Sequence, residues 1–151
     1  MSEHAARVAW ERRGATFTDA RYGRAHKWRF DGGVEVAASA SPHVVAAPMS
    51  DPSAVDPEEA FVAAIASCHM LTFLWLAAKA GFVVDSYVDD AIGRMGENAA
   101  GREAVTRVAL RPVIRWSGAR RPTDEDVRRL HHDAHEQCYI ANSVTTEITV
   151  L

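Results

Sequence analysis

The sequence has few of the features that build secreted scaffolds, nucleic-acid interfaces or membrane spans. Its 151 residues include only two cysteines, too few for a disulfide framework and not spaced as Cys-x-x-Cys. The net charge of −3 gives no basic excess that would favour nucleic acid or an anionic membrane. The first residues, MSEHAARVAWERRGA, lack the apolar core of a secretory signal. We therefore expect a cytoplasmic protein with reduced thiols.

No hydrophobic run reaches the roughly 20 residues that a membrane-spanning helix needs. The longest run, 60–78, is rich in alanine and is interrupted by Ser67, His69 and Thr72. We expect it to form a helix that is buried on all sides, in a soluble core or a subunit interface. The sequence also lacks a phosphate-binding loop with its lysine and a Gly-x-Ser-x-Gly elbow, so nucleotide binding and serine hydrolysis have no support.

What is present is an ordinary globular composition, 48% hydrophobic and 25% charged, with a clear order of elements. Alternating residues around Asp-Gly-Gly predict a β-hairpin. Asp56, Pro57 and Glu59 form a capping box that starts a long helix, and Gly81 ends it. The expected elements are a hairpin over 24–40, the helix, long strands over 82–95 and 102–116, a helix over 121–138 and a strand over 143–150. This order predicts one α+β domain over residues 1–151.

The two cysteines are the candidate reactive groups. Cys68 lies in the apolar helix, where position alone favours a buried structural thiol, and Cys138 ends the second helix, where exposure is expected. Both helices must pack on the same sheet, so the thiols can meet. A thiolate that attacks an oxidant becomes a sulfenic acid, and a second thiol condenses with it to a disulfide. Such chemistry needs a nearby cation to lower the pKa of the first thiol, and an acid to hold that cation.

Several motifs together resemble the OsmC/Ohr family of organic hydroperoxide reductases, from about Ala20 to the end of the chain. They are Asp-Pro-Glu-Glu at 56–59, a small-residue helix that reaches Ser67-Cys68, and Cys138 followed by Tyr-Ile-Ala-Asn-Ser-Val. The resemblance implies an OsmC/Ohr-like α+β fold in an intertwined homodimer, with active sites at the subunit interface. It also implies a hydroperoxide substrate, an external dithiol reductant, and no metal or organic cofactor.

The same resemblance implies the roles of individual residues. Cys68 is the expected peroxidatic cysteine, Cys138 the resolving cysteine, and Glu58 the acid that orients an arginine. Two residues are candidates for the arginine that Glu58 orients. Arg21 matches the Arg-x-Gly pattern, and Arg24 begins the better-formed strand.

The chain departs from the commoner family patterns at both cysteines. His69 stands where many members have an aromatic residue, and Cys138-Tyr-Ile-Ala-Asn stands in place of Cys-Pro-x-Ser-Asn. These departures indicate a divergent subgroup and leave the preferred peroxide open.

Glu58 raises a geometric problem because it lies ten residues before Cys68. That separation is about 15 Å along a helix, and the two side chains are not on one face. Three arrangements remain: a break in the helix, an arginine that bridges the gap, or a Glu58 that serves the partner subunit's site. Without the resemblance, Glu58 is simply a first-turn acid that stabilises the helix dipole.

The histidines offer alternatives. His131, His135 and Cys138 share one helical face, a spacing that suits zinc or nickel with Cys68 or His69 as a fourth ligand, or simply a solvated histidine-rich helix. His69 points about 100° away from Cys68, so we expect it to line a pocket or to hydrogen-bond at the interface. The alternatives to a peroxidase are a non-catalytic protein that binds a small apolar ligand and a metal-binding protein.

Overall fold

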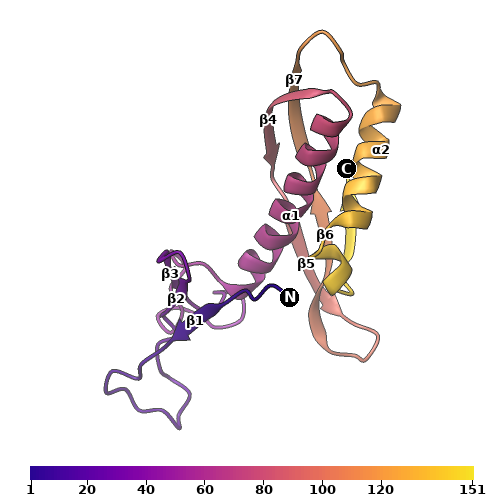
Figure 1. The fold of residues 1–151 in the computed structure, drawn as a ribbon. Helices are drawn as coiled ribbons and strands as arrows, with labels where there is room; N and C mark the ends of the chain where they lie inside the picture. Colours follow the sequence, from indigo (N-terminus) through magenta and orange to yellow (C-terminus); the bar gives the residue numbers. More distant parts are fainter. The chain divides into compact units, whose positions relative to one another are not determined.

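The computed structural model describes residues 1–151 and divides into two compact units, Met1–Ala60 and Phe61–Leu151. Two α-helices and eight strands confirm the predicted α+β class. The first unit holds three strands, and the second holds most of helix α1 (Pro57–Lys79) and all later elements (Figure 1). The single domain over 1–151 remains a prediction.

The first unit is a three-stranded antiparallel sheet in the order β1-β2-β3. Its strands are β1 (Ala6–Ala9), β2 (His26–Phe30) and β3 (Glu35–Ala38). The β2–β3 pair is the hairpin predicted over 24–40. In its turn the Phe30 amide donates to the Val34 carbonyl at 3.0 Å, and Gly33 has a φ of +87°, which glycine adopts without strain.

Helix α1 begins and ends at the predicted signals. The Glu59 amide donates to Asp56 Oδ1 at 2.7 Å, and the Asp56 amide donates to Glu59 Oε2 at 3.2 Å, which completes the capping box. Pro57 is the first helical residue, where its missing N–H costs nothing. After Lys79 the chain reverses through Gly81, whose φ is +79°.

The long strands predicted over 82–95 and 102–116 are each two strands, which corrects that expectation. The elements are β4 (Val83–Asp89), β5 (Ile92–Glu97), β6 (Glu103–Leu110) and β7 (Pro112–Ser117). At the break, Asp89 Oδ1 accepts the Arg111 amide at 2.7 Å, and Pro112 has no amide to donate. The long hairpin is therefore divided between two sheets.

These strands form a two-stranded sheet, β4-β7, and a three-stranded sheet, β5-β6-β8. The closing strand β8 (Glu147–Val150) confirms the predicted strand over 143–150 and pairs in parallel with β6. The helices lie side by side in Figure 1, and α1 packs on the β4-β7 sheet through Phe73, whose ring lies 5.6 Å from that of Tyr87 and 6.0 Å from that of Trp116.

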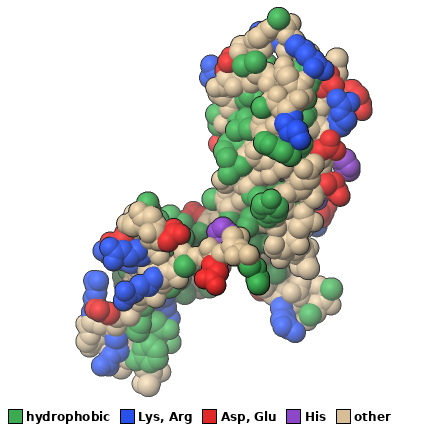
Figure 2. All heavy atoms as spheres, in the orientation of Figure 1, with side chains coloured by type: hydrophobic (Ala, Val, Ile, Leu, Met, Phe, Trp, Pro, Cys, Tyr) green, Lys and Arg blue, Asp and Glu red, His purple; other side chains and the backbone are tan.

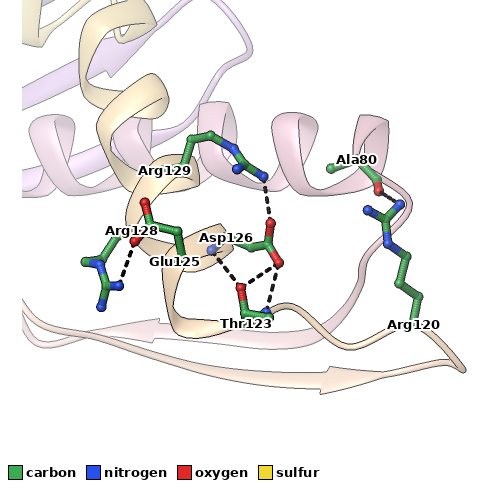
Figure 3. A network of polar contacts seen from close by, with 7 residues as sticks. All are labelled: Ala80, Arg120, Thr123, Glu125, Asp126, Arg128 and Arg129. Atoms are coloured by element: carbon green, nitrogen blue, oxygen red, sulfur yellow. Dashed lines mark hydrogen bonds and ion pairs between the residues drawn. The ribbon is translucent and has the colours of Figure 1, made fainter.

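Helix α2 (Asp124–Gln137) begins at a second capping box, shown in Figure 3. The Asp126 amide donates to Thr123 Oγ1 at 3.1 Å, and Asp126 Oδ2 accepts the Thr123 amide at 3.0 Å. In the loop before the helix, Arg120 donates to the Ala80 carbonyl at 2.6 Å. A short 3-10 turn, η1 (Ala141–Ser143), follows α2.

Helix α1 buries one narrow stripe of side chains and leaves the rest of its surface open. The stripe is Ile65, His69, Phe73 and Ala77, each four residues after the last. Phe73 and Ala77 join Phe82, Leu130 and Ala134 in one apolar cluster, and Ile65 joins Val108 and Leu110 in another. His69 is thus the polar member of an otherwise apolar stripe.

Burial of α1 on all sides within the chain's own core was a wrong expectation, and the subunit-interface alternative remains. Leu71 is 60% exposed and Trp75 is 52% exposed. By length and composition alone the helix could cross a membrane, since its most apolar 18-residue window has a mean hydropathy of 1.9. Only 22% of that window is buried within the chain. Figure 2 shows hydrophobic side chains on the part of the second unit that carries α1, whereas charged side chains gather beside α2.

Candidate functional site

The two thiols meet where α1 packs against α2, and both are free. Cys68 is half-buried in the middle of α1. Cys138 caps the C-terminus of α2 and is fully buried, which corrects the expectation that it would be the more exposed. Burial raises the pKa of Cys138, and a hydrogen bond with the Cys68 side chain raises it further.

The backbone around Cys138 fixes its thiol in place. Its amide donates to the His135 carbonyl at 3.3 Å, and the Ala141 amide donates to Cys138 Sγ at 3.4 Å. The side chain of Asn142 donates to the Cys138 carbonyl at 3.0 Å. The turn from α2 into η1 therefore aims the sulfur at α1. Two thiols in contact can close into a disulfide, so the arrangement is suited to two-electron redox chemistry.

Beside the thiols, His69 of α1 and His131 of α2 form a direct contact. Nε2 of His69 lies 3.0 Å from Nδ1 of His131, and the ring planes are within 8° of parallel. One imidazole donates a hydrogen bond to the other. His69 is 1% exposed, and its Nδ1 atom is buried without a hydrogen-bond partner.

Both imidazoles of this pair are held in the neutral form. Burial, followed by the positive charges of His131 and His135, lowers the pKa of His69 to about 4. Burial lowers the pKa of His131 to about 4. On its other side the His131 ring stacks on Phe73, with ring centres 4.3 Å apart. At neutral pH the pair is therefore an uncharged polar contact inside an apolar cluster.

The three-ligand metal site, which the sequence offered as an alternative, does not assemble. His131, His135 and Cys138 follow one another on α2 as expected, but no group of three or more His, Cys, Asp or Glu side chains is placed to hold a metal ion. His131 is instead engaged with His69 and Phe73.

Glu58 lies in the first turn of α1, with one carboxylate oxygen buried and without a hydrogen-bond partner. Because α1 runs unbroken from Pro57 to Lys79, the break considered for the sequence does not exist. Glu58 and Cys68 are separated by about 15 Å along the helix. The bridging arginine and the partner subunit's site are the two arrangements that remain.

The two candidate arginines differ sharply in their surroundings. The Arg24 guanidinium stacks over the Tyr22 ring at 3.9 Å and donates to the carbonyls of Ala20 and Tyr22. It is thus engaged by its own loop. The side chain of Arg21 is exposed and makes no hydrogen bond or ion pair, and only its backbone amide is bonded, to Asp19 Oδ1 at 3.0 Å.

A groove of about 520 Å³ runs along α1 and α2 next to the thiols. Its lining residues are Leu71, Thr72, Trp75, Glu136, Gln137, Tyr139 and Asn142. Thr72 and Asn142 connect it to the cysteines, because Thr72 Oγ1 donates to the Cys68 carbonyl at 2.9 Å and Asn142 bonds that of Cys138. The apolar lining residues of the groove, Leu71 and Trp75, lie about one and two helical turns after Cys68 on α1.

Sequence reasoning missed two partners in this region. Phe73, which stacks on His131, was detectable because it follows His69 by one helical turn on the buried stripe. The Ala141 amide, which donates to the Cys138 sulfur, leaves no trace in residue type because any non-proline residue would supply it.

A family model described as OsmC-like protein matches residues 50–151. Among solved structures, the chain is similar to an OsmC-like protein of unknown function from Vibrio cholerae O1 biovar eltor str. N16961. The two are 54% identical with a TM-score of 0.97, over 100% of this chain and 99% of that one. A search of curated proteins found no match.

More distant structures share the fold. An OsmC like protein from Mycoplasma pneumoniae is 13% identical with a TM-score of 0.72, over 99% of this chain and 95% of that chain. An organic hydroperoxide resistance protein from Elizabethkingia anophelis is 17% identical with a TM-score of 0.71, over 99% of this chain and 96% of that chain. These matches confirm the expected OsmC/Ohr-like fold.

Proposed function

Because the chain belongs to the OsmC-like protein family, we propose that it is a cysteine-based peroxidase that reduces organic hydroperoxides and is itself reduced by an external dithiol. The proposal rests above all on one observation: of the only two cysteines of the chain, one lies on α1 and one caps the end of α2, and the Cys68 side chain is near enough to raise the pKa of Cys138 through a hydrogen bond. Structures similar in fold include one described as an organic hydroperoxide resistance protein.

The proposed cycle has two chemical steps. The Cys68 thiolate attacks the terminal peroxide oxygen, an S–O bond forms, the O–O bond breaks, and the released alkoxide takes up a proton and leaves as the alcohol. The Cys138 sulfur then attacks the sulfenic sulfur, the S–O bond breaks, and the hydroxyl leaves as water with the Cys138 proton. An external dithiol returns two electrons and two protons to the disulfide.

The surroundings of the thiols support this division of roles. Cys68 is half-buried and lies one helical turn before Thr72, which lines the groove, so it is the thiol better placed for a peroxide to attack. Cys138 is buried, and its raised pKa keeps it protonated at neutral pH, which suits a thiol that acts only after Cys68 has been oxidised.

For the thiolate-stabilising arginine we propose Arg21 rather than Arg24. The Arg24 guanidinium is already bound to Tyr22 and to two loop carbonyls, whereas the Arg21 side chain has no partner in its own chain. Glu58 would orient Arg21 through its unpaired carboxylate oxygen.

A pulse of cumene hydroperoxide on the reduced protein tests the peroxidase. We expect wild-type protein to lose both thiols, Cys138→Ser to accumulate a sulfenic acid that dimedone traps on Cys68, and Cys68→Ser to keep its remaining thiol. Survival of both wild-type thiols at neutral pH would show that the assignment is wrong. The alternative, a non-catalytic protein that binds a small apolar ligand in the groove, would then be preferred.

We propose further that the protein is a homodimer that covers the open face of α1. Leu71 and Trp75 are large apolar side chains on one helix, and both are more than half exposed in the isolated chain. We expect the wild type to sediment at twice the 16.5 kDa of one chain, and Trp75→Glu to sediment as a monomer. Sedimentation of the wild type as a single 16.5 kDa species would overturn the dimer.

A further inference from the structure

Helices α1 and α2 share two polar contacts, and the peroxidase cycle uses only one of them. The first joins the thiols of Cys68 and Cys138. The second joins His69 Nε2 to His131 Nδ1 at 3.0 Å. No other hydrogen bond links the side chains of the two helices, so the imidazole contact is the polar feature that accompanies the dithiol.

If the imidazole contact served only to pack the two helices together, it would stabilise the fold less than an apolar contact would. His69 is 1% exposed, and its Nδ1 atom has no hydrogen-bond partner. A buried polar atom without a partner destabilises the folded state, because it has lost its hydrogen bonds to water and gained none in return. His131 packs on Phe73, a member of the main apolar cluster, where an apolar side chain of the same shape would pack without that cost.

The position of the contact suggests what it does. His69 is the residue after Cys68, so whatever fixes the backbone at His69 also fixes it at Cys68. His131 lies two helical turns before Cys138 on the same face of α2, and α2 is a continuous helix up to that cysteine. A hydrogen bond has a narrow range of lengths and directions, whereas apolar contacts tolerate sliding.

A disulfide has an equally narrow requirement, because the two Cα atoms must lie about 4.4–6.8 Å apart. Small changes in the spacing of α1 and α2 therefore change how readily Cys68 and Cys138 close into a bond. A contact that fixes the two helices at the correct spacing raises the effective concentration of one thiol at the other.

We propose that His69 and His131 are positioning residues: their hydrogen bond holds α1 and α2 at the spacing from which Cys68 and Cys138 close into a disulfide. The inference deepens the proposed peroxidase by assigning a role to residues outside the sulfur chemistry. The expected effect is on the equilibrium between the two thiols and the disulfide of Cys68 and Cys138, whatever the oxidant is.

Exchange with dithiothreitol measures this effect without any peroxide. The two protein thiols and oxidised dithiothreitol give the protein disulfide and reduced dithiothreitol, with two electrons and two protons transferred. The equilibrium constant is read from the fraction of free thiol at known ratios of the two dithiothreitol forms.

We expect His131→Phe to lower this equilibrium constant about 5-fold, as the loss of one net hydrogen bond implies. The phenylalanine ring keeps the stack on Phe73 but offers nothing to His69 Nε2. His131→Asn should restore at least half of the logarithmic loss, because its amide occupies the place of Nδ1 and both donates and accepts. The control is His132→Phe, an exposed neighbour with no contact to His69, which should match the wild type.

An unchanged constant in folded His131→Phe would overturn the proposal, as would an equal fall in His132→Phe or a failure of asparagine to restore it. If His131→Phe does not fold, the double variant His69→Phe/His131→Phe replaces it, since removing both polar partners leaves none unpaired. The double variant must show the same fall.

The two proposals fail in different ways. If cumene hydroperoxide leaves both wild-type thiols intact while the dithiothreitol equilibrium falls in His131→Phe, only the peroxidase is wrong. If the peroxide cycle runs and the equilibrium does not change in His131→Phe, only the positioning role is wrong.

Discussion

Helix α1 meets its surroundings in two different ways along its length. Toward its C-terminal end, Phe73 and Ala77 pack with Phe82 and two residues of α2 in a cluster of buried apolar side chains, with Tyr87 and Trp116 at its edge. Around its middle, Cys68 and His69 meet a thiol and an imidazole of α2. The interface between α1 and α2 therefore has an apolar end, near the C-terminus of α1, and a polar end, at the middle of α1.

The comparison separates what stabilises the fold from what makes it reactive. The apolar end gains its free energy mainly from burial, although the Tyr87 hydroxyl at its edge is also buried without a hydrogen-bond partner. The polar end keeps a buried Nδ1 atom of His69 without a partner and a buried thiol, Cys138, whose pKa is raised. Residues that cost stability and lie next to a reactive group are typical of functional sites.

The largest effect should come from the apolar end. We expect Phe73→Ala to lower the free energy of unfolding by about 3–5 kcal/mol, because the ring is fully buried against Tyr87, Trp116 and His131. Cys138→Ala, at the polar end, removes only a sulfur and should cost about 1 kcal/mol. Urea unfolding in the presence of dithiothreitol measures both.

Val113→Ala is the matched control for these variants, because Val113 is 67% exposed and its truncation should change stability by about 0.5 kcal/mol or less. If Cys138→Ala cost as much as Phe73→Ala, the two ends of the interface would not differ in the way that we infer.

The sequence predicted the features that depend on neighbours along the chain. Asp56 and Glu59 predicted the start of α1, and Thr123 predicted the start of α2. Both could be predicted because a capping side chain bonds to the backbone within one turn of the helix that it starts. Asp-Gly-Gly likewise predicted the turn of the β2–β3 hairpin. The cysteine pairing was expected partly from two helices on one sheet and partly from family resemblance.

The sequence did not predict features that depend on distant residues. The break between the strand pairs involves the Arg111 amide bonded to Asp89, 22 positions away. The contact of His69 with His131 spans 62 positions. Cys138, at the end of a polar helix, was expected to be exposed but is buried by the chain around it. Each depends on how elements pack, which local patterns do not encode.

A smaller effect should come from acid at the polar end. The folded-state pKa of His69 and of His131 is about 4, below the ordinary value of 6.5. Between these values the unfolded chain binds more protons than the folded one, so the free energy of unfolding should fall as pH falls from about 7 to 4. One imidazole with this shift accounts for on the order of 3 kcal/mol, and their contact makes the pair less than additive.

Urea unfolding at pH 7, 6, 5 and 4 measures this dependence, and His69→Phe/His131→Phe is the variant that tests its origin. Its stability should change much less over the same range, since neither imidazole remains to be protonated. Asp89 opposes the trend, because burial raises its folded pKa and it therefore gains a proton earlier in the folded state. Parallel pH curves for the wild type and the double variant would show that the acid sensitivity arises elsewhere, and that the polar end is no less tolerant of acid than the apolar one.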